Sequence, residues 1–132
     1  MSSETELLER IYAEWGSGDS SSGEFLHPEF ELTFAPGFLD EGVFTGPAEA
    51  WRGWREWLEQ WETWNYELVR FLELEDGRIA AIIDVTGIGK ATGIELSFRS
   101  GNLWEIEDGL ARRVRLYAHH DDLLRELGLE SA

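Results

Sequence analysis

The chain has 132 residues, of which 27 are acidic and 11 are basic, giving a formal net charge of −16 at pH 7. This length fits a single domain over residues 1–132, and the 42% hydrophobic content argues against a disordered chain. The negative charge disfavours binding to nucleic acid or to an anionic membrane, and the absence of cysteine excludes disulfides and thiolate chemistry.

The N-terminal part predicts a helix followed by a strand. Ser3 and Glu6 form a capping-box pattern, and apolar residues then recur at helical spacing: Leu7, Leu8, Ile11, Tyr12 and Trp15. After a Ser/Gly-rich surface loop, the alternation in Glu29–Phe34 predicts a half-buried strand with Phe34 on its apolar face. Residues 35–46 are expected to form a long loop, of the kind that often covers a binding site.

Five tryptophans, at positions 51, 54, 57, 61 and 64, make the next segment the most informative one. Gly46-Pro47 predicts a helix start, and at about 100° per residue the first four indoles share one helical face. Such a face either overfills a core or walls an apolar cavity. We interpret most of these indoles as core and one or two as cavity lining.

The second half predicts four strands and a short terminal helix. The strands cover about 63–75, 78–86, 94–106 and 110–118, with turns at Asp76-Gly77 and Asp108-Gly109, and residues 121–127 form the helix. Short turns favour antiparallel pairing. The order of elements therefore predicts an α+β fold and not a parallel βαβ fold.

Several strings, in this order, resemble the SnoaL-like, ketosteroid-isomerase-like branch of the nuclear transport factor 2-like superfamily. They are His27-Pro28, Gly46-Pro47, Gly87–Gly93 with Ile94–Leu96, Leu103-Trp104 before Asp108-Gly109, Arg113–Tyr117 and Leu123–Leu129. The resemblance implies a cone-shaped barrel of a curved, mainly antiparallel sheet wrapped around N-terminal helices. It also implies an apolar pocket and a homodimer formed through the outer sheet face.

The chemistry known for this superfamily does not carry over by position. A ketosteroid isomerase needs a carboxylate base, a tyrosine and a protonated aspartate. The corresponding positions here are Phe34–Ala35, Ile11 and Gly101, although Tyr12 is adjacent to the second. An epoxide-hydrolase relative would need an acid where Leu116 stands.

Asp84 is the candidate catalytic residue because it interrupts an apolar strand. Strand parity groups it with Ala80 and Ile82, and on a pocket face desolvation would raise its pKa and suit it to acid–base work. The alternative is that Asp84 faces outward or pairs with Arg99 or Arg115. The predicted ligand-binding residues are Tyr12, Trp15, Phe34, Trp54, Trp57, Trp61, Asn102 and Trp104. Asn102 shares a strand face with Ser100 and Trp104, unless Gly101 forms a bulge.

No metal or cofactor is predicted. His119-His120-Asp121-Asp122 looks like a metal cluster, but neighbouring side chains of an extended segment point apart and the acids suit a helix cap. Arg112, Arg113 and Arg115 are expected to pair with acids across the sheet.

Two functional hypotheses follow, beside a third possibility of a purely structural dimer whose cavity is filled by tryptophans. In the first, a Trp-lined pocket binds a small, neutral, apolar ring-type molecule, with isomerase- or cyclase-type acid–base catalysis as an extension. In the second, the same fold is a non-catalytic module that binds a ligand or a protein. The N-terminus lacks the basic and apolar regions of a signal peptide, so a cytoplasmic location is expected.

Overall fold

The computed structural model describes residues 3–16, 25–35 and 42–129. Their elements are α1 (Ser3–Gly16), β1 (Leu26–Phe34), β2 (Gly42–Thr45), α2 (Pro47–Leu58), β3 (Trp61–Glu73), β4 (Ile79–Gly89), β5 (Glu95–Glu107), β6 (Leu110–Tyr117) and α3 (His120–Glu126). Two boundaries correct the sequence analysis. The expected loop 35–46 contains β2, which pairs with β1, and Trp61 begins a strand and does not extend the helix.

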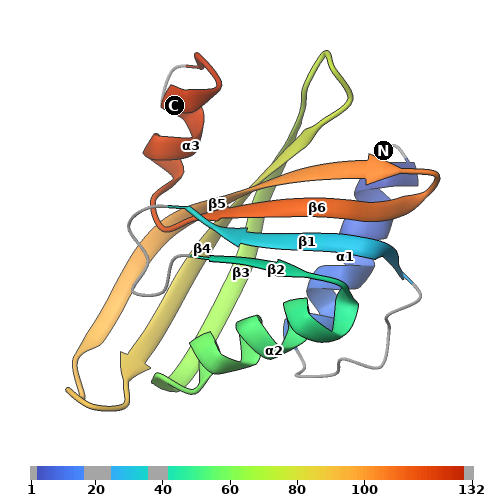
Figure 1. Ribbon diagram of the computed structural model, residues 1–132. Coiled ribbons are helices and arrows are strands. Elements are labelled where there is room, and N and C mark those ends of the chain that lie inside the picture. Colours follow the sequence, from blue (N-terminus) through green and yellow to red (C-terminus); the bar gives the residue numbers. More distant parts are fainter. Residues whose placement is uncertain (1–2, 17–24, 36–41, 130–132) are drawn as a thin grey trace.

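The strands form one curved six-stranded sheet in the order β2-β1-β6-β5-β4-β3 (Figure 1). Every neighbouring pair is antiparallel except β1 and β6, which run parallel. Helices α1 and α2 lie on one side of the sheet and α3 packs against β5 and β6 on the other (Figure 1). The predicted α+β fold, a curved and mainly antiparallel sheet with helices, is confirmed.

The inner face of the sheet, which packs against α1 and α2, carries the main core. This core includes Leu8, Ile11, Phe30, Leu32, Trp104 and Val114, all at most 1% exposed. Burial of this apolar surface is the main force that holds the helices on the sheet. Helix α2 approaches closely because Gly53 has no side chain, and a Cβ there would lie 2.8 Å from the Phe44 ring.

A second, smaller core lies under α3 on the outer face. Ala80 and Ile82 of β4 contact Leu123 of α3 there. Gly101 makes this contact possible, since a Cβ at that position would lie 2.7 Å from Leu123 Cδ2. The pairing of β4 with β5 runs without a shift through Ile82 and Gly101, so the bulge considered for Gly101 is absent from this described ladder.

None of the helices in the described ranges is long and apolar enough to cross a membrane.

Candidate ligand-binding cavity

A largely apolar cavity lies between the two helices and the inner face of β3–β6. Its lining residues are Tyr12, Trp54, Trp57, Trp64, Tyr66, Ile83, Phe98, Ser100, Asn102, Trp104 and Leu116. The space free of atoms is about 500 Å³ when the open mouth is counted, but the centre of a water molecule can reach only about 30 Å³ of it. The side chains therefore leave room for about two water molecules.

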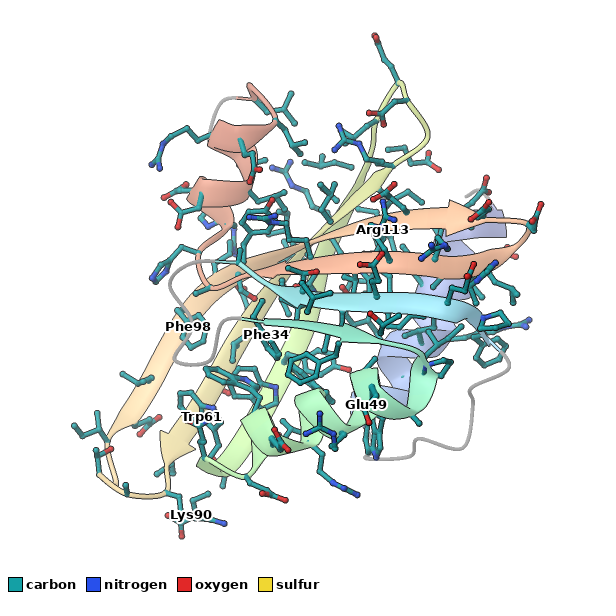
Figure 2. All side chains as sticks on the ribbon, viewed as in Figure 1. Phe34, Glu49, Trp61, Lys90, Phe98 and Arg113 are labelled. Atoms are coloured by element: carbon teal, nitrogen blue, oxygen red, sulfur yellow. The ribbon has the colours of Figure 1, made fainter. Side chains whose placement is uncertain are left out.

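Indoles form one end of the cavity. Trp54 and Trp57 point from α2 onto the ring of Trp64 on β3, with ring centroids 6.0 and 5.8 Å away in edge-to-face geometry. Trp61 packs behind them, 5.0 Å from Trp64 and 5.8 Å from Trp57. Figure 2 shows Trp61 and Phe98 at the end of the sheet where β3 begins. Aromatic packing of this kind adds about 0.5–1.5 kcal/mol per pair beyond area burial.

Tyr12 organises the polar end. Its hydroxyl oxygen accepts a hydrogen bond from Nδ2 of Asn102 at 2.6 Å and another from Nε1 of Trp104 at 2.8 Å. The Tyr66 hydroxyl donates to the main-chain carbonyl of Tyr12 at 2.5 Å, and the two tyrosine rings meet edge to face. This network joins α1, β3 and β5 around the cavity, so it fixes the position of the Tyr12 hydroxyl.

The environment of Tyr12 makes it a hydrogen-bond donor. Burial raises the pKa of the Tyr12 hydroxyl well above its usual value of 10.0, and the bonds from Asn102 and Trp104 only partly oppose this. The hydroxyl therefore stays protonated at any ordinary pH. Because both of its oxygen lone pairs are engaged, what it can still offer is its own proton.

The structure gathers five of the eight predicted ligand-binding residues at the cavity: Tyr12, Trp54, Trp57, Asn102 and Trp104. Their role in binding stays a prediction. Phe34 and Trp61 are not in the lining, which corrects the sequence analysis. Phe34 is a core residue, 4% exposed, between Phe44 and Trp57.

Trp15 lies in α1, but its side chain is outside the described part of the structure. Sequence reasoning missed Tyr66 and Phe98 as lining residues. Both alternate with exposed polar neighbours along their strands, a pattern that groups residues on one face without saying which face meets the helices.

The predicted pocket orientation of Asp84 is wrong. Its carboxylate accepts hydrogen bonds from Arg99 at 2.7 and 3.0 Å, and both side chains are more than two-fifths exposed. The Arg99 guanidinium holds the pKa of Asp84 below its usual value, the opposite of the expected direction. Strand alternation correctly placed Asp84 on the same face of β4 as Ala80 and Ile82. That face is turned toward α3 and solvent, since Ile83, on the other face of the strand, lines the cavity.

Acidic and imidazole side chains are not among the residues described as lining the cavity. His119, which is exposed, touches it only indirectly, with its ring 6.3 Å from that of Phe98. Within the described ranges, no three His, Asp or Glu side chains gather closely enough to hold a metal ion. Arg112 and Arg113 of β6 pair across the sheet as expected, both with Glu31, whereas the Arg115 guanidinium lies over the ring of Tyr117 and shows no ion pair within the described residues.

Comparison with known proteins supports the same architecture. A family model described as SnoaL-like domain matches residues 8–114. TerC, co-crystallized with polyporic acid, superposes with a TM-score of 0.78 at 17% identity, over 94% of this chain and 97% of TerC. An NTF2-like protein of unknown function from Burkholderia pseudomallei gives 0.79 at 17% identity, over 95% and 97%. A protein described as a SnoaL-like polyketide cyclase from Jannaschia sp. gives 0.75 at 16% identity, over 98% and 92%. No curated protein matches the chain in sequence.

Proposed function

We propose that this chain, which belongs to the SnoaL-like domain family, binds a small, neutral ring compound in the cavity between α2 and the sheet. The observation that carries the proposal is the Tyr12 hydroxyl, which lines a largely apolar cavity and is held by Asn102 and Trp104 with its proton free to donate. A few fixed polar groups in an apolar wall are typical of ligand sites.

The proposed ligand is flat and uncharged. Faces of aromatic rings pack well against indoles, which supply most of the wall at the α2 end. With a net charge of −16 on the protein and no cationic side chain in the described lining, an anion would gain nothing to offset its desolvation. A ring ketone or lactone fits both conditions, because its oxygen can accept the Tyr12 proton.

The cavity as it stands has room for about two water molecules, so a ring compound enters only if side chains move. Trp54 and Trp57 are buried, at 8% and 7% exposure, whereas Trp64 and Phe98 are half-buried. Only the half-buried rings can turn without opening the core. We expect Phe98 to shift outward when the ligand enters.

Binding without catalysis is the favoured form of the proposal. Acid–base catalysis near neutral pH needs a group beside the ligand that gains or loses a proton there; burial raises the pKa of the Tyr12 hydroxyl, and Asp84, the candidate for that role, lies on the opposite face with Arg99. The named relatives, one described as a SnoaL-like polyketide cyclase and one co-crystallized with polyporic acid, support a ring ligand.

A titration followed by intrinsic tryptophan fluorescence tests the proposal. The panel would contain naphthalene, α-tetralone, coumarin and a simple phenol, each added to the wild-type protein and to Tyr12→Phe. We expect saturable changes with the ketone and the lactone, and binding weakened about three- to tenfold by Tyr12→Phe, the value of one neutral hydrogen bond. Absence of any saturable response would refute the proposal. Conversion of a bound compound by the wild type, lost in Tyr12→Phe, would favour an enzyme.

A further inference from the structure

The indole end of the cavity carries a feature that the ring-binding proposal does not use. We infer that the N–H group of Trp64 forms a second hydrogen-bonding point, so that the ligand carries acceptor oxygens at two opposite edges of its ring system. This inference rests on the proposed function and narrows the ligand class to flat ring compounds with two acceptors, such as dicarbonyls.

A buried donor in the cavity lining supports this inference. Within the described part of the chain, Nε1 of Trp64 is inaccessible to solvent and has no hydrogen-bond acceptor. Trp104, on the same inner face, shows the usual outcome for a buried indole, since its N–H donates to Tyr12. A buried donor without an acceptor is costly, and native proteins contain few of them.

The sheet register places this donor away from Tyr12. Trp64 is paired with Gly87 of β4. Asn102, the partner of the Tyr12 hydroxyl, is paired with Ala81, which lies six positions before Gly87 in the same strand. At about 3.3 Å per strand residue, the two backbone positions are roughly 20 Å apart, and the long side chains of Trp64 and Tyr12 reach the same cavity from its two ends.

Gly87 makes room for the second indole. A Cβ at Gly87 would lie 2.9 Å from Cε3 of Trp61 and 2.9 Å from the carbonyl oxygen of Thr63. The Trp61 ring can therefore lie directly over the strand, against Trp64. The absence of a side chain at this position is what allows two indoles to gather at one end of the cavity.

The chemistry of these groups selects the ligand. An indole N–H is a donor only, and the Tyr12 hydroxyl has both lone pairs engaged, so each end of the cavity offers a proton. A ligand that satisfies both ends must bring two acceptors. The alternative is that the indole N–H groups point at neighbouring rings, since Trp57 lies edge to face with both Trp61 and Trp64, but such contacts are weak.

Indole ¹H–¹⁵N NMR spectra of the wild-type protein test the inference directly. The probes are naphthalene, α-tetralone and menadione, which share a two-ring frame and carry zero, one and two carbonyl groups. We expect menadione to move the Trp64 indole proton downfield, as a new hydrogen bond would, and naphthalene to leave it in place. An upfield shift, or no shift, at saturating menadione would overturn the inference and favour contacts with the neighbouring rings.

Calorimetric titration of Trp64→Phe provides the second readout. The ratio of menadione affinity to α-tetralone affinity should fall about three- to tenfold, because both ligands lose the same ring contact but only menadione loses a hydrogen bond. Trp51→Phe, the same substitution at a position outside the described lining, should leave the ratio within twofold. The wild-type spectra decide the question alone if Trp64→Phe does not fold.

The outcomes separate this inference from the proposed function. Equal binding of menadione and α-tetralone, with an unchanged ratio in Trp64→Phe, would overturn the second hydrogen-bonding point and leave ring binding standing. Failure of all three compounds to bind would overturn both.

Discussion

Substitution of Tyr12 by phenylalanine perturbs the group on which the polar end of the cavity depends. The change removes one oxygen and leaves the ring. It deletes two hydrogen bonds, from Asn102 at 2.6 Å and from Trp104 at 2.8 Å, and leaves both donors beside an apolar edge. Trp104 is 1% exposed and Asn102 is 6% exposed, so both donors are shielded from bulk solvent.

The expected loss of stability follows from these contacts. A neutral hydrogen bond contributes about 1 kcal/mol net, and a donor left unsatisfied in the interior costs about 1–3 kcal/mol. Tyr12→Phe should therefore lower the free energy of unfolding by about 2–4 kcal/mol. Tyr66→Phe is the matched control. Its hydroxyl makes a single bond, to the main-chain carbonyl of Tyr12, and its loss should cost only about 1 kcal/mol.

Urea denaturation measures both losses, with unchanged m-values as the sign that the two-state description holds. A double-mutant cycle of Tyr12→Phe with Asn102→Ala should give a coupling energy of about 1 kcal/mol, because the two residues share one of the deleted bonds. If Tyr12→Phe costs less than about 1 kcal/mol, or no more than Tyr66→Phe, the network does not fix the hydroxyl and the reasoning is wrong.

Three further predictions concern the rest of the fold. By urea denaturation, Trp54→Ala should cost about 3–5 kcal/mol because the indole is 8% exposed, and Trp61→Ala, which is half-buried, should cost clearly less; equal losses would contradict this packing. Asp84→Asn should give a small loss of stability at pH 7. This loss should disappear as the pH falls below about 4, because Arg99, which lowers the pKa of Asp84 below its usual 3.8, stabilises only the ionised carboxylate. A loss of stability that persists at pH 2 would refute the ion pair. Gly101→Ala should cost about 1–3 kcal/mol through its contact with Leu123, and Leu123→Ala in the same chain should recover part of this.

Much of the fold could be predicted from the sequence, because hydrophobic periodicity is a local signal. Alternation along β5 grouped Ser100, Asn102 and Trp104 correctly, and all three line the cavity. The short β2 was not predicted. Its four residues pair with β1 through main-chain hydrogen bonds, which leave little trace in a short sequence.

The candidate site could be predicted only in part, because strand parity says which residues share a face but not which face is covered by helices. Asp84 illustrates this limit. Its neighbours Ala80 and Ile82 are buried as the sequence suggested, but under α3 and not at the cavity. The hydrogen bonds of Tyr12 connect residues about 90 positions apart, and no local pattern reports such a contact. The predicted homodimer and cytoplasmic location stay predictions.

The central claim is that the cavity accepts a neutral ring compound, and calorimetric titration with α-tetralone at several temperatures tests it most directly. The account predicts saturable binding of one molecule per chain, a negative heat-capacity change from burial of apolar surface, and weaker binding to Tyr12→Phe. Absence of binding at millimolar α-tetralone, or binding that Tyr12→Phe and Trp57→Ala both leave unchanged, would contradict it.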